Sequence, residues 1–309
     1  MQYRRLGRAG IKLSAISLGS WLTYGGSVES DEAKSCVRAA LDLGINHFDT
    51  ADAYQGGQAD RALRRALDGV PRSALVLASK VYWPIGPGPN DRGTSRKHLF
   101  ESVEASLRRL GTDYVDILYC HRFDDETDPE ETLFALNDLV VQGKALYAGI
   151  SEWPAHRIRE ARGIQRRLGL RALAASQPIY NLLNRGIERE VLPACMDEGI
   201  GLIVFSPLAQ GLLTGKYRKD EPAPEGSRAE RHQGMLRADN LERVERLRAV
   251  ADQAGIPMAQ LALAWVLHQP GITAALIGAS QPSQVQENAA AAEVALTADL
   301  RAAIEEAVK

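Results

Sequence analysis

Four residues whose side chains could carry out acid–base chemistry each follow a short apolar segment of the sequence. Asp49 and Tyr54 leave one such segment five residues apart, and Lys80 and His121 follow two later ones. A phenol has an ordinary pKa of about 10, so we expect a nearby ammonium such as Lys80 to favour the phenolate and lower that pKa. Asp49 would keep Lys80 charged, and His121 could hydrogen-bond a substrate carbonyl. Together they could deliver a proton to an oxygen that develops negative charge.

Each of these residues also fits a structural role when it is considered alone: a loop aspartate, a packed tyrosine, a surface lysine and a satisfied loop histidine. Complementary side chains at the ends of neighbouring strands are harder to explain by scaffold needs. The sequence has no evident nucleophile–base pair, and its six histidines are dispersed without a HExxH pattern, so a metal-dependent hydrolase lacks support. Reduction of a carbonyl by hydride from a bound cofactor fits best.

The overall composition is that of an ordinary globular protein, with 45% hydrophobic and 25% charged residues among 309. A formal charge of −2 gives no basic field to hold nucleic acid. No apolar run approaches the ~20 residues that span a bilayer, so we expect no membrane association. The N-terminus lacks the apolar core of a signal peptide, and the three cysteines, Cys36, Cys120 and Cys195, are far apart. Both features favour a cytoplasmic location.

Strand and helix patterns alternate eight times after a predicted hairpin formed by residues 3–6 and 11–13. Strands are expected at residues 15–18, 47–48, 74–78, 115–119, 145–150, 172–176, 202–205 and 274–277. Helices are expected at residues 30–43, 60–67, 95–110, 129–141, 154–168, 188–198, 241–254, 258–268, 282–290 and 297–308. This order predicts one domain, residues 1–309: a (β/α)8 TIM barrel with an N-terminal β-hairpin and extra C-terminal helices. A doubly wound open sheet is the alternative, but the glycines from Gly19 to Gly26 do not fit its dinucleotide fingerprint.

The motif Gly44-x4-Asp49-Thr50-Ala51-x2-Tyr54, with Lys80 and His121, resembles the aldo-keto reductase superfamily, and the resemblance extends from Tyr3 to Asn288. It implies that Tyr54 is the general acid, that Lys80 tunes it, that Asp49 pairs with Lys80 and that His121 orients the carbonyl. The substrate would be a small aldehyde or ketone with an apolar portion, and the residues implied to contact it are Trp21, Tyr54, Trp83 and His121.

Three further motifs are similar to the branch that contains the voltage-gated potassium channel β subunits and related bacterial reductases. They are Leu18-Gly19-Ser20-Trp21, the stretch from Gly211 to Tyr217, and Gly278-Ala279-Ser280-x3-Gln284-x2-Glu287-Asn288. This similarity implies NADPH in an extended pose across the barrel mouth. Ser151 and Gln177 would hold its nicotinamide carboxamide, with Phe205 stacked on the ring. Ser206, Leu208, Gly211 and Lys216 would line the pyrophosphate, and Arg228, Ser280, Gln284, Glu287 and Asn288 would take the adenosine end. Ser20, Trp21, Asp49, Pro207 and Gly278 complete the implied contacts.

Two functions compete under this resemblance. One is an NADPH-dependent reductase that produces an alcohol, and the other is a cofactor-binding regulatory or redox-sensing subunit with little turnover. The channel subunits commonly lack the histidine that stands here as His121 and often carry an N-terminal extension, whereas the hairpin here starts at Tyr3. Both points favour the reductase, and a homo-oligomer is compatible with either function.

Two charged residues near the expected site leave open how it would treat charged substrates. Glu152 stands where the channel subunits carry a basic residue, so it adds nothing favourable for an anion. Arg122 could hold an anionic group, or it could be a solvated neighbour of Asp124 and Asp125.

Overall fold

Eight parallel strands close into a barrel in a computed structural model that describes residues 1–21, 30–218 and 236–309. Around the barrel the strand order is β10-β3-β4-β5-β6-β7-β8-β9. The strands are β3 (Ile16–Gly19), β4 (His47–Asp49), β5 (Val76–Val81), β6 (Val115–Cys120), β7 (Ala145–Ile150), β8 (Ala175–Ser176), β9 (Gly201–Phe205) and β10 (Ile272–Ile277). The predicted (β/α)8 barrel is confirmed. The open-sheet alternative is wrong, because β10 pairs with both β9 and β3 and leaves no sheet edge.

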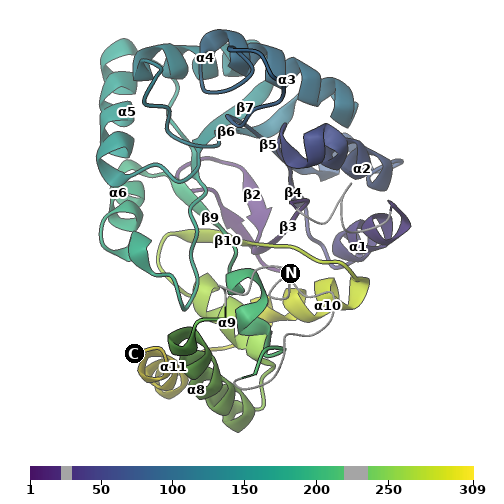
Figure 1. Cartoon of the computed structure of the whole chain (residues 1–309), viewed down its shortest axis with the longest axis vertical. Helices are drawn as coiled ribbons and strands as arrows, with labels where there is room; N and C mark the ends of the chain where they lie inside the picture. The colour runs from purple at the N-terminus through teal and green to yellow at the C-terminus, as the bar shows by residue number, and fades with distance from the viewer. Residues whose placement is uncertain (22–29, 219–235) are drawn as a thin grey trace.

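The barrel helices lie outside the strands (Figure 1). They are α1 (Ser30–Asp42), α2 (Gln58–Ala66), α3 (Arg96–Leu110), α4 (Pro129–Val141), α5 (Ala155–Leu168), α6 (Val191–Glu198), α9 (Met258–Leu267) and α10 (Pro282–Ala290). Two further helices, α8 (Ala238–Ala254) and α11 (Ala298–Ala307), lie together at one end of the molecule, as expected for extra C-terminal helices. Every residue of β5 and β6 is buried, because helices cover the outside of the barrel and side chains fill its interior.

The N-terminal hairpin closes the bottom of the barrel. Its strands are β1 (Tyr3–Arg5) and β2 (Lys12–Ser14). Leu6 and Leu13 belong to the same buried cluster as the barrel side chains Ile203 and Ala274. Gly7 has a φ of +55°, and a Cβ there would lie 2.4 Å from the carbonyl oxygen of Gly199, so the close approach requires glycine. With the bottom closed, the carboxyl ends of the strands form the open mouth.

Several predicted elements have different bounds in the structure. The strand expected at residues 74–78 is β5 (Val76–Val81), and the helix expected at residues 241–254 begins at Ala238. The strand expected at residues 172–176 is only two residues long, because only Ala175 and Ser176 align with β7 and β9. The helix expected at residues 188–198 begins at Val191, after a 3-10 turn at Gly186–Glu188. The later start keeps Pro193 in the first turn, where its missing N–H and its ring are tolerated.

No single helix in the described ranges is long and apolar enough to cross a membrane. Helices α8 and α9 pass the length and composition test only as a pair, and they bend by 95° where they meet. Nearly all of α9 is buried.

Candidate active site

Three residues from three different strand ends form a buried polar network at the mouth. Asp49 ends β4, Lys80 lies near the end of β5, and Gln177 follows β8. The Lys80 ammonium donates to the Asp49 carboxylate and, at 3.0 Å, to the carbonyl of Thr50. The Gln177 side chain donates to the second Asp49 oxygen at 2.8 Å. Burial alone would lower the pKa of Lys80, but the adjoining Asp49 carboxylate outweighs it and raises that pKa, so Lys80 remains an ammonium.

Tyr54 lies directly beside the Lys80–Asp49 pair, at the start of a 3-10 turn (Tyr54–Gly57) that follows β4. The next residue, Gln55, has a φ of +51°, a left-handed conformation that a side chain rarely adopts. The Lys80 nitrogen lies 4.9 Å from the centroid of the Tyr54 ring. Burial raises the pKa of the phenol, and Lys80 opposes that rise without overcoming it. The expected lowering of this pKa is therefore wrong, because desolvation dominates, and the phenol carries its proton at neutral pH.

His121 directly follows β6, and its ring faces Tyr54. The two ring centroids are 5.7 Å apart in an edge-on arrangement. Burial, helped by the nearby charges of Lys80 and Arg122, lowers the pKa of His121 to about 2. The imidazole is therefore neutral at physiological pH, and its buried Nδ1 has no hydrogen-bond partner among the described residues. A neutral ring in this place can hydrogen-bond a carbonyl oxygen without competing for the proton of Tyr54.

Aromatic rings make a continuous chain across the mouth. Trp21 lies 6.5 Å from Tyr54, which faces His121, and His121 lies 6.2 Å from Trp83. Trp21 is 42% exposed and Trp83 is 39% exposed, so both side chains are accessible to a ligand that enters the mouth. The structure thus brings together the residues predicted to contact substrate.

The predicted cofactor residues nearest to Asp49, Tyr54, Lys80 and His121 also lie at the ends of barrel strands. The Ser151 hydroxyl donates to the carbonyl oxygen of Gln177 at 2.8 Å. The Ser20 backbone N–H donates to the carbonyl oxygen of Asp49 at 2.9 Å, so the end of β3 is tied to the end of β4. The Ser20 hydroxyl is buried without a partner among the described residues, so it is available to a ligand.

The segment after β9 carries a second group of predicted cofactor residues. Phe205, Ser206, Pro207 and Leu208 lead into a 3-10 turn at Ala209–Thr214. Ser206, Ala209 and Gln210 all have φ values between 48° and 57°, and such strained conformations cluster at functional sites. A Cβ on Gly211 would lie 3.2 Å from the Lys216 side chain, which places Lys216 next to this turn.

The third predicted group lies after β10. Gly278 and Ser280 precede α10, which carries Gln284, Glu287 and Asn288. The Gln284 side chain accepts hydrogen bonds from the Ser280 backbone and hydroxyl at 2.9 and 3.3 Å. Asn288 is buried, whereas Gln284 and Glu287 are exposed. Arg228, which was assigned to this group, lies outside the described residues.

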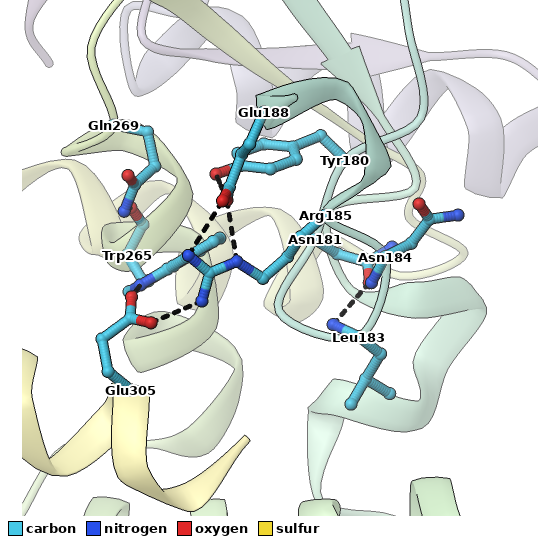
Figure 2. A network of polar contacts seen from close by, with 9 residues as sticks. All are labelled: Tyr180, Asn181, Leu183, Asn184, Arg185, Glu188, Trp265, Gln269 and Glu305. Atoms are coloured by element: carbon cyan, nitrogen blue, oxygen red, sulfur yellow. Dashed lines mark hydrogen bonds and ion pairs between the residues drawn. The ribbon is translucent and has the colours of Figure 1, made fainter. Parts of the chain in front are cut away.

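Sequence reasoning missed the network that fixes the loop after β8 (Figure 2). Arg185 pairs with Glu188 and with Glu305 of α11. Trp265 of α9 donates to Glu305 at 2.9 Å, and the Tyr180 hydroxyl donates to Glu188 at 2.6 Å. The C-terminal helices therefore hold the loop that begins with Gln177. No local pattern signals this network, because its partners are up to 120 residues apart.

Two other residues near the site were also missed. Asn181, in the loop after β8, donates to the carbonyl oxygen of Ser206 at 3.0 Å and so joins that loop to the segment after β9. Asp52, between Asp49 and Tyr54, is 2% exposed, and neither of its carboxylate oxygens has a hydrogen-bond partner among the described residues. Burial raises the pKa of Asp52 to about 7. The signal that could have identified Asp52 is its position inside the motif that runs from Gly44 to Tyr54.

Comparisons with known proteins agree with this arrangement. A model described as the aldo/keto reductase family matches residues 15–309. An Arabidopsis thaliana protein named as a probable voltage-gated potassium channel subunit beta is 43% identical over 302 residues, which cover 95% of this chain and 92% of the relative. A rice (Oryza sativa subsp. japonica) protein with the same name is 41% identical, with coverage of 95% and 92%. The L-glyceraldehyde 3-phosphate reductase of Escherichia coli K12 is 40% identical, with coverage of 93% and 86%.

Proposed function

The chain belongs to the aldo/keto reductase family, and on that premise we propose that it reduces an aldehyde or ketone to an alcohol with NADPH. The observation that carries the proposal is the buried Lys80–Asp49 pair directly beside Tyr54, with the neutral ring of His121 facing the phenol. This arrangement places a protonated phenol and a neutral hydrogen-bonding ring next to the same accessible space.

NADPH, when bound, supplies the hydride. The chain's own residues handle the substrate oxygen, on which negative charge develops. Tyr54 donates its hydroxyl proton to that oxygen, and the Lys80 ammonium stabilises the phenolate that remains. Asp49 keeps Lys80 charged and fixed in position, and Gln177 holds the second oxygen of Asp49. His121 hydrogen-bonds the carbonyl and orients it toward Tyr54.

The residues present suit a dinucleotide cofactor. The hydroxyl of Ser20, which has no partner among the described residues, and the polar side chains of Ser151 and Gln177 would hold the nicotinamide end, with Phe205 against the ring. Lys216 is exposed and has no carboxylate partner in the described ranges, so it would meet the pyrophosphate. Ser280, Gln284, Glu287 and Asn288 would take the adenosine end. The family generally uses a nicotinamide cofactor, and NADPH rather than NADH is our proposal.

A regulatory or redox-sensing subunit with little turnover is the second candidate, favoured by the relatives that are named as channel subunits. His121 argues against it, because a residue that only supported cofactor binding would not need to face Tyr54. We also propose a cytoplasmic location, supported by three cysteines that are all buried and free.

Oxidation of NADPH in the presence of simple aldehydes tests the proposal when wild type is compared with Tyr54→Phe. We expect the variant to bind NADPH with unchanged affinity, because it loses only a hydroxyl, and to lose kcat by roughly 10²-fold or more. Unchanged turnover in the variant would reject Tyr54 as the general acid. Absence of turnover in wild type, with NADPH bound, would favour the regulatory subunit.

A further inference from the structure

Arg122 follows His121 at the end of β6 and turns toward the mouth of the barrel. Its guanidinium lies 5.5 Å from the centroid of the Trp83 ring. Within residues 1–21, 30–218 and 236–309, its guanidinium makes one hydrogen bond, to the carbonyl oxygen of His121, the preceding residue. Arg122 has no carboxylate partner among the described residues, and it is half-buried rather than fully solvated.

The two acidic neighbours that could have neutralised Arg122 are engaged elsewhere. The Asp124 carboxylate accepts from the Thr94 backbone at 2.7 Å and from the Thr127 hydroxyl at 2.8 Å. Asp125 points to Arg157, 3.5 Å away. The structure therefore removes the alternative in which Arg122 is simply the solvated partner of Asp124 and Asp125.

Glu152, an acidic residue that follows β7, is also engaged away from Arg122. Its carboxylate accepts a hydrogen bond from the backbone N–H of Ile179 at 2.7 Å. The backbone of Glu152 has a φ of +57°, a strained conformation, in the same structure in which its side chain accepts this bond. Glu152 is thus committed to the loop after β8, and it makes no ion pair with Arg122.

The positive charge of Arg122 acts electrostatically on His121 and Tyr54, the groups proposed to contact the substrate carbonyl. It contributes to the lowering of the pKa of His121 and opposes the rise in the pKa of Tyr54. Lys80, the other cation that acts on Tyr54 and His121, is already matched by Asp49. Among the described charged groups beside these two residues, Arg122 therefore leaves an uncompensated positive charge, which adjoins the space in which a carbonyl would meet Tyr54 and His121.

Arg122 is also remote from the residues assigned to the cofactor phosphates. It follows β6, whereas those residues follow β9 and β10. In the closed barrel β6 is separated from β9 by two strands and from β10 by three. An anion at Arg122 would therefore be part of the substrate.

We infer that Arg122 binds a carboxylate or phosphate group of the substrate, so that the preferred substrates are short aldehydes or ketones that carry an anion. This inference rests on the proposed reductase activity. Trp83 would cover the apolar part of the molecule, and the fork of the guanidinium suits either anion.

Two matched substrate pairs test the inference with the NADPH-loaded protein. Succinic semialdehyde is compared with its methyl ester, and glyceraldehyde 3-phosphate with glyceraldehyde. We expect wild type to prefer at least one anion. Preference in the first pair identifies a carboxylate, and preference in the second identifies a phosphate.

Arg122→Gln should lower kcat/KM for the preferred anion by roughly 10- to 100-fold, the range for loss of a charge-assisted hydrogen bond, mainly through KM. The uncharged member of the pair should lose much less than the anion, since it lacks this bond and is affected only through the weaker influence of the Arg122 charge on His121 and Tyr54.

Arg157→Gln is the matched control. Arg157 also lies against an aromatic ring, Phe123, but its charge is met by Glu160 and Asp125. It should behave as wild type, and Arg122→Lys should retain part of the preference because it keeps the charge. Added salt should raise KM only for the anionic substrate.

Equal use of both members of each pair by wild type would overturn the inference. An equal loss on both members in Arg122→Gln would overturn it as well, because it would indicate a structural role. Both of these results leave the proposed reductase intact. If no aldehyde is reduced although NADPH binds, the reductase proposal fails and this inference fails with it.

Discussion

The ammonium of Lys80 lies 4.9 Å from the centroid of the Tyr54 ring, and both side chains are held at the same mouth of the barrel. Lys80 itself is fully buried and bonded to Asp49, so its charge is fixed in position. The phenol therefore keeps its proton in the free protein, yet it has a cation next to it for the moment when the proton leaves.

Lys80→Met should remove both turnover and stability. The activity should fall by about 10²-fold or more because Tyr54 loses the cation that stabilises its phenolate. The free energy of unfolding should fall by about 3–5 kcal/mol, because Asp49 would remain as an unpaired buried charge. Urea unfolding and NADPH oxidation measure the two effects.

The double variant Lys80→Met/Asp49→Asn serves as the control for that experiment. It should recover much of the lost stability without recovering activity, because the uncompensated charge is gone but Tyr54 still lacks its cation. A double variant that regained turnover would contradict the role of Lys80.

Asp52 should make the stability depend on pH. Its pKa is about 7 in the folded protein and is raised from an ordinary value of 3.8, mainly by burial. Between these two pKa values the folded state holds a proton that the unfolded state has released. The contribution of Asp52 to the free energy of unfolding is therefore complete below the unfolded pKa and is lost as pH rises through the folded pKa.

Asp52→Asn removes that ionisation. At pH 8 it should raise the free energy of unfolding by roughly 2–4 kcal/mol relative to wild type, and near pH 4 it should have little effect. Urea unfolding at both pH values measures this difference. Asp68→Asn, at an exposed position, should show no such dependence. The same change in stability at both pH values would count against a buried, unpartnered carboxyl.

Arg185→Gln should loosen the loop after β8. It would leave Glu188 and Glu305 without their shared cation, while the bonds from Tyr180 and Trp265 remain. Because Arg185 is 32% exposed, solvent screens part of the effect. We expect a loss of about 1–2 kcal/mol in unfolding free energy.

Arg166→Gln is the matched control for Arg185. Arg166 pairs with Glu198 on the surface and is 58% exposed. Its loss should cost less than about 1 kcal/mol. Equal effects of the two substitutions would indicate that the network in Figure 2 adds nothing beyond a surface ion pair.

NADPH should bind more tightly than NADH in fluorescence titrations, by about tenfold or more, the value of one charge-assisted hydrogen bond to the 2′-phosphate. Lys216→Met should weaken both cofactors alike, because the pyrophosphate is common to them. Equal affinities of wild type for NADPH and NADH would remove the 2′-phosphate role proposed for Arg228, Ser280 and Gln284.

Much of the fold was predictable because its signals are local. Helix α4, strand β7 and helix α10 have the predicted bounds. Their signals are a proline at the first helical position, a glycine that follows a helix, and short apolar runs, all of which act within a few residues. The eightfold alternation of strands and helices then favours a closed barrel, in which no strand is left at an open edge.

The sequence by itself determined that Asp49, Tyr54, Lys80 and His121 occur at successive strand ends. It also determined that they share one face of the barrel, because the carboxyl ends of parallel strands lie on the same side. Only the tertiary structure decided what surrounds them. Burial reversed the expected direction of the Tyr54 pKa, and Gln177 reached Asp49 across 128 residues. Arg122 turned to the mouth while Asp124 and Asp125 bonded elsewhere. Desolvation and the choice of partner depend on every element packed around a group, so no window of sequence contains them.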